Sequence, residues 1–296
     1  MDGRTHLTLA SPAFSDLAVQ DALVWGETAE AGPAGLQGPH FFREFAQNLF
    51  AFEALEPVSV VKRLEAEPEP YSLQWFVNIE NRRHSKQGRW IPKLLEFTKH
   101  AGETLLGLGH GLGTDWAQYA RHGAQVVVCS PSPSQLELVR RNFEVRKLTG
   151  RFVQAAAGRL PLENASIDVA LLSSLTHGVG DMAQVVAEVF RVLRPGGKVL
   201  AVTSARYDID FWFNAFFFWS RWFGVKRRRK PPTHVGFSGR ELRRLFQPFA
   251  DTRVHKRQLR RSEVPHVWRW IPIPLLARWM GRVLIFKGFK PVRASE

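Results

Sequence analysis

The sequence predicts a doubly wound α/β domain with a mostly parallel, seven-stranded sheet and a helical N-terminal extension. Three observations support this prediction. From residue 103 onward, short apolar runs alternate with amphipathic helical segments, as in βαβ units. A glycine-rich turn separates the first of these runs from a helix. The 296 residues are 45% hydrophobic, which is enough to build a sizeable core.

The region before the sheet is predicted from its composition and periodicity. Residues 1–40 mix alanine, glycine, proline and acids without a sustained period, so we expect a loosely ordered tail. Apolar residues then recur at helical spacing, which predicts a helical lead-in over 41–102. The sheet domain is expected over 103–296, with an aromatic and basic insertion at about 208–236.

Parallel strands that are buried on both faces read as nearly continuous apolar runs. The predicted strands are Thr104–Gly109, Gln125–Ser130, Arg151–Ala156, Ile167–Ser173, Lys198–Thr203, Arg253–Leu259 and Arg282–Phe289. The predicted helices are Asp115–His122, Ser134–Lys147, Met182–Leu193 and Ser238–Phe246. We expect the third helix to end at the Arg-Pro-Gly-Gly sequence 194–197 and the fourth to begin with a capping box of Ser238 and Glu241.

A turn with glycine at every second position is the sharpest local signal, and its glycines are Gly107, Gly109, Gly111 and Gly113. Glycine permits positive φ and close approach of the backbone to a ligand, and the following helix offers free backbone amides. The dinucleotide fingerprint Gly-x-Gly-x-x-Gly does not fit, because its last position falls on Leu112, Thr114 or Trp116. The turn therefore predicts a nucleotide-sized site and disfavours a nicotinamide or flavin enzyme.

Residues Thr104–Arg206 resemble the class I S-adenosylmethionine-dependent methyltransferases, particularly their small-molecule and quinone-type branch. The resemblance rests on four motifs in order: LLGLGHGLGTD, VVVCSPSPSQLELVRRNF, AAAGRLPLENASIDVALL and VFRVLRPGGKVLAV. It implies a Rossmann-like methyltransferase fold with S-adenosyl-L-methionine as cofactor. The implied reaction is transfer of the cofactor's methyl group to a small, lipophilic acceptor.

The resemblance also implies which residues bind the cofactor: Gly107, Gly109, His110, Gly111, Gly113, Cys129, Ser130, Ala156 and Ala157. The family pattern has acidic residues at the positions of Gly107, Cys129 and Ala156, and this sequence has none there, although Asp168 of the fourth-strand motif is retained. Each hydrogen bond to a charged group contributes about 1.5–3 kcal/mol. A catalytically degenerate fold that serves in binding or membrane association is therefore the alternative to an enzyme.

Two further residues are candidates for chemistry. His177 follows the fourth predicted strand and would lie at the carboxyl edge of the sheet, as a general base or a substrate contact. A loop histidine without a catalytic role is the alternative. Cys129 lies in an apolar strand, which predicts a buried, inert thiol rather than a nucleophile. No Cys and His spacing typical of metal sites is present, so we expect no metal.

Positive charge is concentrated in the C-terminal third. The net charge is +14, and residues 204–296 carry 21 basic and 6 acidic side chains. Within this third, Phe211–Phe223 is aromatic and is followed by the basic run Lys226–Lys230, which suits the headgroup zone of an anionic membrane surface. A substrate-covering helix followed by a solvated loop is the alternative. RNA ranks below the membrane because no RNA-binding motif is visible.

The sequence predicts a cytoplasmic protein that is peripheral to the inner face of a membrane. A single cysteine cannot form an internal disulfide. The N-terminus lacks the basic region and unbroken apolar run of a signal peptide. The apolar run Phe211–Phe223 is shorter than the roughly 20 residues that a membrane-spanning helix needs.

Overall fold

The computed structural model describes residues 68–85, 88–175, 181–216, 236–264, 268 and 270–292. The chain divides into two units, Met1–Glu56 and Pro57–Glu296, and every described residue belongs to the second. The predicted tail, the first part of the helical lead-in, His177 and the basic run Lys226–Lys230 all lie outside the described residues.

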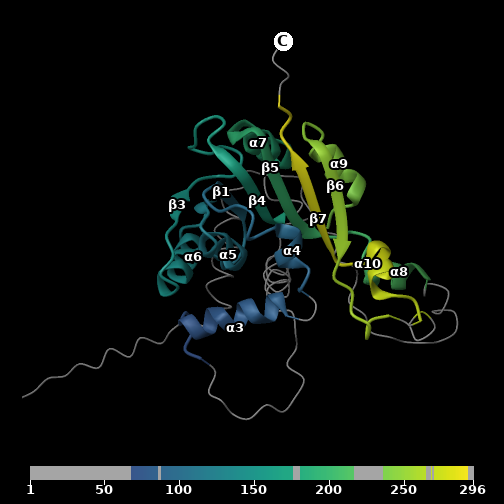
Figure 1. The fold of residues 1–296 in the computed structure, drawn as a ribbon. Coiled ribbons are helices and arrows are strands. Elements are labelled where there is room, and N and C mark those ends of the chain that lie inside the picture. Colours follow the sequence, from purple (N-terminus) through teal and green to yellow (C-terminus); the bar gives the residue numbers. More distant parts are fainter. Residues whose placement is uncertain are drawn as a thin grey trace, which may run out of the picture. The chain divides into compact units, whose positions relative to one another are not determined.

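Seven strands form one sheet in the order β3-β2-β1-β4-β5-β7-β6 (Figure 1). The parallel strands are β1 (Thr104–Gly109), β2 (Gln125–Ser130), β3 (Arg151–Gln154), β4 (Ile167–Leu175) and β5 (Leu193–Ser204). β7 (Val283–Phe289) is antiparallel to both β5 and β6 (Ala250–Arg257). The chain winds outward from β1 to β3 and then returns to β4, which makes the carboxyl ends of β1 and β4 the switch point where such sheets bind ligands. The predicted fold class is confirmed.

Eight described helices accompany the sheet. They are α3 (Leu73–His84), α4 (Ile91–Leu95), α5 (Thr114–Arg121), α6 (Pro133–Val145), α7 (Met182–Val192), α8 (Ile209–Phe216), α9 (Gly239–Leu245) and α10 (Ile273–Met280). α7 and α9 cover one face of the sheet and α5 and α6 the other (Figure 1). The capping box of α9 is confirmed, because the Ser238 hydroxyl accepts from the Glu241 amide at 3.2 Å and the Glu241 carboxylate accepts from the Ser238 amide at 2.7 Å.

The structure corrects several predicted boundaries. The Arg-Pro-Gly-Gly sequence 194–197 lies within β5, where the pairing with β4 is irregular, and does not separate helix from strand. β3 ends at Gln154 rather than Ala156. β6 ends at Arg257 because Gln258 adopts a positive φ of 65° that breaks the extended backbone. α10 was not predicted as a helix, because its proline-rich first turn breaks the helical sequence pattern.

A second, smaller hydrophobic cluster joins α8 and α10 beside the sheet. Its buried members are Ile209, Leu259, Val264, Leu276, Ala277 and Met280. Arg282 lies between the segments that form this cluster and pairs with Asp210 at 2.6 Å, Glu263 at 3.1 Å and Asp208 at 3.4 Å. The first part of the aromatic segment is therefore packed and charge-anchored against the end of the sheet domain.

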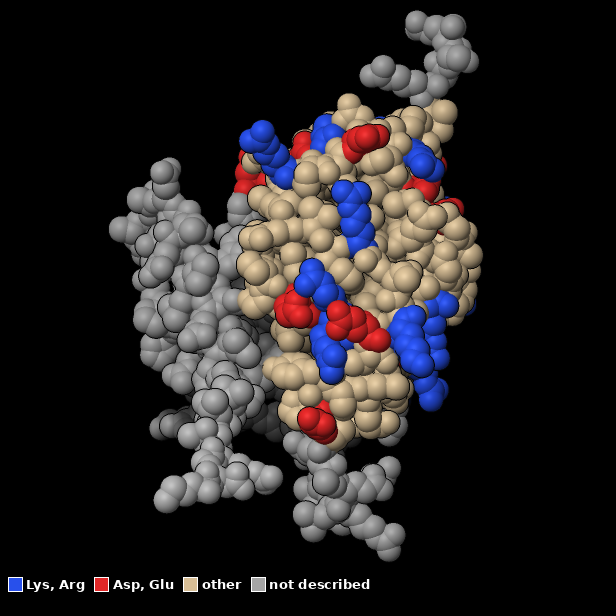
Figure 2. Space-filling view, turned by 90° about the vertical axis from the view of Figure 1, so that its left-hand side faces the viewer, with Lys and Arg blue, Asp and Glu red and all other residues tan. Residues whose placement is uncertain are grey.

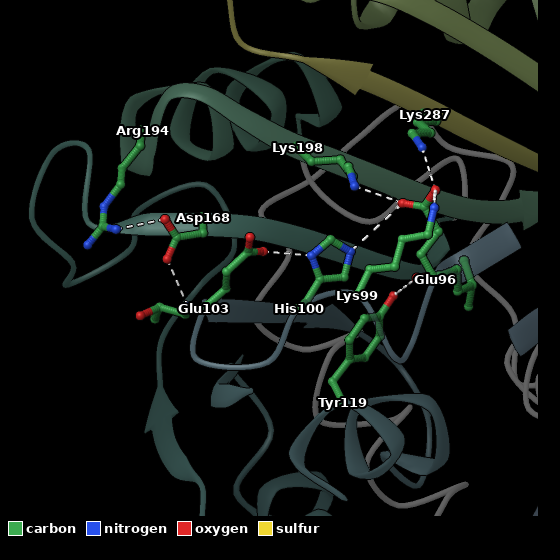
Figure 3. Close-up of polar contacts among 11 residues, drawn as sticks. Glu96, Lys99, His100, Glu103, Tyr119, Asp168, Arg194, Lys198 and Lys287 are labelled. Carbon is green, nitrogen blue, oxygen red and sulfur yellow. Dashed lines mark hydrogen bonds and ion pairs between the residues drawn. The ribbon is translucent and has the colours of Figure 1, made fainter. Parts of the chain in front are cut away.

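Glu96, just after α4, ties the helical lead-in to the sheet (Figure 3). Its carboxylate accepts hydrogen bonds from Lys198 on β5 at 2.7 Å and from Lys287 on β7 at 2.8 Å. Burial alone would raise the pKa of Glu96, but the hydrogen bonds and charges of the two lysines outweigh burial and lower the pKa from 4.5 to about 2. The carboxylate thus stabilises the fold while it is ionised.

We expect the Glu96→Gln variant to lose stability and to flatten its dependence on pH. A carboxyl group with a lowered folded pKa contributes fully above its unfolded pKa of 4.5, and the contribution disappears as the pH falls toward about 2. The shift corresponds to about 3 kcal/mol at 1.36 kcal/mol per pKa unit. Urea unfolding between pH 2 and pH 6 measures this effect, with the exposed Glu137→Gln as control. A parental pH profile in Glu96→Gln would show that the ion pairs do not stabilise the fold.

Candidate functional site

The ends of three parallel strands bring the sequence-predicted site positions to one edge of the sheet. Gly109 pairs with Ser173 of β4, and Ser130 pairs with Gln154 of β3. The turn after β1, the end of β2 and the exposed Ala156 after β3 therefore lie at adjoining strand ends. Ala157 is half-buried and packs against the main core.

The glycines of the turn have conformations that other residues rarely adopt. Gly109, Gly111 and Gly113 have φ of 114°, 136° and 73°. A Cβ on Gly109 would lie 1.8 Å from the carbonyl oxygen of Ser173, and one on Gly113 would lie 2.6 Å from the side chain of Val139. The turn therefore approaches β4 and α6 more closely than any other residue type would allow.

Side chains of α6 donate hydrogen bonds to the backbone carbonyl groups of the turn. Gln135 donates its amide to the Gly109 oxygen at 2.8 Å and to the Gly111 oxygen at 3.4 Å. The fully buried Asn142 donates to the Leu112 oxygen at 2.7 Å. No side chain caps the start of α5, where Gly113 is the N-cap residue. The first amides of α5 thus retain the capacity to donate to an anionic or polar ligand group.

Ser130 completes a neutral polar network at the end of β2. Its hydroxyl donates to the Gln135 side-chain oxygen at 2.8 Å and accepts from the Ser132 amide at 3.2 Å. Ser132 in turn caps α6 by accepting from the Gln135 amide at 3.2 Å. The network links the end of β2 to the glycine turn through Gln135, a residue that the sequence analysis did not select.

Cys129 does not present its side chain at this edge. The thiol is 2% exposed and packs in the main core with Leu108 and Leu172. Burial raises its pKa to about 11. The predicted buried thiol is confirmed, whereas the mapping of the acidic position onto Cys129 is corrected. Because side chains alternate along a strand, the neighbouring Ser130 faces the glycine turn instead.

An aromatic ring fills the space beside Gly107. A Cβ built on Gly107 would lie 2.8 Å from atoms of the Trp116 indole, which is 2% exposed. The indole nitrogen is buried and has no hydrogen-bond partner among the described residues. An acidic side chain at position 107 would therefore collide with Trp116, so the absence of the acid and the presence of the indole are linked.

Asp115, the carboxylate within the turn sequence, forms an ion pair with the helical lead-in. Its oxygens accept from the Arg83 guanidinium at 2.8 and 2.5 Å and lie 3.3 Å from His84. Arg83 and Asp115 are each 5% exposed. Burial would raise the pKa of Asp115, but the charge of Arg83 and the hydrogen bonds from His84 and Arg83 lower it well below its usual range. Asp115 therefore anchors α3 on α5 and is occupied by these partners.

The remaining candidates lie in different places. His110 is half-buried in the turn, and burial lowers its pKa, which keeps the imidazole neutral at pH 7. His177 lies outside the described residues. Asp168 stands at the amino end of β4, at the opposite edge from the turn, where it accepts from the Thr104 amide at 2.9 Å and from Arg194 at 2.7 Å (Figure 3). The retained Asp168 thus links β4 to the start of β1 and to Arg194 of β5.

The residues present fit S-adenosylmethionine at the glycine turn, which allows close approach of a ligand. The buried side chains of Ser130 and Gln135 hydrogen-bond to each other, and Gln135 also binds the turn, so that they hold the turn in this conformation. At Gly107 the indole of Trp116 fills the space and supplies no carboxylate. The site therefore offers neutral hydrogen-bonding groups at the end of β2.

Comparison with known proteins agrees with the motif order. Residues 106–201 match a family described as "Methyltransferase domain". An uncharacterised methyltransferase of Mycobacterium sp. (strain JLS) is 36% identical over 107 residues, which are 36% of this chain and 40% of that protein. A demethylmenaquinone methyltransferase of Clavibacter sepedonicus is 36% identical over 104 residues, 34% of this chain and 40% of that protein. The chain thus spans about 40% of the length of these relatives.

Solved structures agree on the fold. The [4+2]-cyclase SpnF superposes with a TM-score of 0.51 and 18% identity, covering 84% of this chain and 93% of that one. A Haloferax volcanii complex of the Trm112 activator with a putative methyltransferase gives a TM-score of 0.50 and 15% identity, covering 75% of this chain and 97% of that one. Together with the sheet order and the glycine turn, the matched family supports a methyltransferase domain of the class I S-adenosylmethionine-dependent type over residues 106–201.

Proposed function

We propose that the chain transfers the methyl group of S-adenosylmethionine to a small, lipophilic acceptor. The observation that carries this proposal is the network of Ser130, Gln135 and the glycine turn at the switch point of the sheet. The network supplies neutral hydrogen bonds at the end of β2, where the family pattern has one of its acids. An adapted cofactor site explains this polar, glycine-lined edge more directly than the degenerate alternative does.

Each part of the site has a stated task in the proposal. When bound, the cofactor supplies an electrophilic methyl group on its sulfonium. In the proposal, the turn Gly109–Gly113 and the start of α5 bind the methionine end of the cofactor. Ser130 and Gln135 hold the ribose, and the loop at Ala156 and Ala157 borders the adenine. The chain accelerates transfer by placing the acceptor in line with the methyl group. We assign the role of general base to His177, which comes two positions after the end of β4 in the sequence.

A lipophilic acceptor is supported by the apolar surroundings of the carboxyl end of β5. The cluster of α8 and α10 lies there, with Trp212, Trp268, Ile271 and Ile273 packed partly buried around its core. Aromatic and aliphatic walls of this kind suit an acceptor with an apolar body. Only one of the relatives named above, the demethylmenaquinone methyltransferase, has an acceptor in its name, so we propose only the chemical class of the acceptor.

Contact with a membrane surface and a cytoplasmic location remain predictions of this proposal. Among the residues that the structure describes, none of the helices has the length and apolarity required to cross a bilayer. The exposed side chains of Trp270, Leu275 and Trp279 next to α10 and within it support an apolar contact surface in the basic C-terminal third. Sedimentation with anionic vesicles at low salt, and release as salt rises, is the expected behaviour.

The proposal is tested by thermal stabilisation of the Ser130→Ala and Gln135→Ala variants by S-adenosylmethionine. A ligand that binds the native state raises its melting temperature by mass action. We expect affinity to fall about tenfold in each variant, because a lost hydrogen bond contributes about 1 kcal/mol and leaves its partner unpaired. Gln125→Ala, at the exposed amino end of β2, is the matched control. Parental affinity in both site variants would show that the cofactor does not bind at this network.

A further inference from the structure

A basic cavity lies at the carboxyl end of β5, at the same edge of the sheet as the glycine turn but toward β7 and β6. It has a volume of 660 Å³ and is formed where β5 ends and β7 begins, with β6, α9 and α10 around it. Ala205, Phe237, Val254 and Leu284 supply apolar walls. Ligand sites commonly have volumes of about 300–1,000 Å³, so the cavity has room for a small organic ligand.

The charged side chains that line this cavity are all basic. They are Arg243 of α9, Lys256 and Arg257 of β6, and Arg278 of α10, and His255 lies among them. No aspartate or glutamate is among the described residues that line the cavity. The lining therefore concentrates four positive charges around one hollow space.

The acidic side chains near the cavity already form ion pairs with arginines that do not line it. Asp208, Asp210 and Glu263 surround Arg282, with the shortest contact at 2.6 Å. Glu241 pairs with Arg206 and closes the capping box of α9. Within the described ranges, Arg243 and Arg278 consequently have no carboxylate partner. Their charges are left for a ligand.

The side of β3 and α6 carries arginines that have acidic neighbours. Figure 2 shows the side of β3 and α6, where lysine and arginine lie among aspartate and glutamate. On α6, for example, Arg140 pairs with Glu137 at 2.7 Å and Arg141 lies 3.8 Å from Glu144. These two arginines have acidic partners, whereas Arg243 and Arg278 at the cavity have none among the described residues.

Two of the basic side chains that line the cavity, Lys256 and Arg257, are held in place by hydrogen bonds to backbone oxygens. The Lys256 ammonium donates to the backbone oxygens of Tyr207 and Trp279, and the Arg257 guanidinium donates to the Lys256 oxygen at 3.2 Å. Burial lowers the pKa of Lys256 to about 8, although Asp208 opposes this shift. A bound anion would relieve the cost of holding these charges together.

We propose that this cavity binds the phosphate groups of a phosphorylated ligand. Arginine guanidinium groups donate paired hydrogen bonds that match phosphate oxygens. A group with two or more negative charges balances four cations better than a single carboxylate does. The apolar walls would contact the carbon skeleton. The cavity adjoins the cluster of α8 and α10 to which the acceptor is assigned, but no residue of the glycine turn or of the Ser130 network lines it, so phosphate binding can be tested separately from cofactor binding.

Binding of pyrophosphate to the full-length chain in physiological salt, measured by calorimetry, tests the proposal. We expect saturable binding that falls at least about tenfold in the double variant Arg243→Gln/Arg278→Gln, because two charge-assisted hydrogen-bonding groups are removed. The double variant Arg240→Gln/Arg244→Gln removes the same charge from exposed positions of α9 and is the control. Circular dichroism checks that both variants are folded.

The outcomes separate cleanly. Loss of binding in the cavity variant with near-parental binding in the control supports the site. Absence of pyrophosphate binding by the parent, or equal losses in both variants, would overturn it. Vesicles of phosphatidylcholine with and without phosphatidylglycerol identify the source of the phosphate. Release from anionic vesicles by pyrophosphate supports a lipid headgroup, and pyrophosphate binding without vesicle binding supports a soluble phosphate ester.

Discussion

Replacing Arg83 by methionine is expected to destabilise the protein by about 3–5 kcal/mol, the usual cost of leaving one member of a buried ion pair without its partner. Asp115 would retain its buried carboxylate with His84 as its remaining side-chain neighbour at 3.3 Å. Because the pKa of Asp115 is lowered in the folded state, the lost stabilisation is largest above its unfolded pKa of 3.8 and shrinks as the pH falls below it. Urea unfolding at pH 7 and at pH 3 measures both effects.

Two further variants show whether the loss of stability comes from the ion pair or from the packing of α3. Arg82→Met changes an exposed arginine on the same helix and is expected to have little effect. The double variant Arg83→Met/Asp115→Leu removes both charges and should regain much of the stability, since a buried pair can be replaced by apolar residues at little cost. Equal losses in the single and double variants would mean that packing of α3, rather than the ion pair, determines the effect.

Replacing Gly109 by alanine is expected to be the most damaging single change at the site. The residue has φ of 114°, and its new Cβ would lie 1.8 Å from the Ser173 carbonyl oxygen, a backbone atom that cannot rotate away. Backbone strain of this kind costs about 1–3 kcal/mol. Overpacking adds about 1–3 kcal/mol. Separation of β1 from β4 at this point should also move Gly111 and reduce cofactor binding.

Gly102→Ala is the matched control for Gly109→Ala. Gly102 also has a positive φ, 80°, but no atom lies within 4 Å of the position that its Cβ would take. It therefore isolates conformational strain from the steric clash. Unfolding experiments should show a clearly larger loss for Gly109→Ala. Equal losses in the two variants would contradict the close contact between the turn and β4.

The sheet was predictable because its strands carry their own signals. Buried runs such as Thr104–Gly109 and Gln125–Ser130 match the observed strands residue for residue, and the capping box of α9 is a local pattern. The glycine turn was predictable for the same reason. Each of these features depends on residues close together in the sequence.

The parts of the site that were missed depend on contacts between distant segments or on the direction of a side chain. Arg83 meets Asp115 across 32 positions, and no local pattern marks either as a partner. The choice between Cys129 and Ser130 depends on which face of β2 meets the core, and a shift of one residue reverses the answer. The contact of Trp116 with Gly107 becomes visible only when α5 is packed on β1.

Calorimetric titration of the purified chain with S-adenosylmethionine and with its demethylated product tests the central claim most directly. The account predicts saturable binding of both ligands near one site per chain, because the proposed contacts of the glycine turn, Ser130 and Gln135 are to parts that the two molecules share. It also predicts weaker binding in Gln135→Ala than in the Gln125→Ala control. Absence of heat from both ligands at high protein concentration would contradict the proposed cofactor site and leave the fold without its proposed reaction.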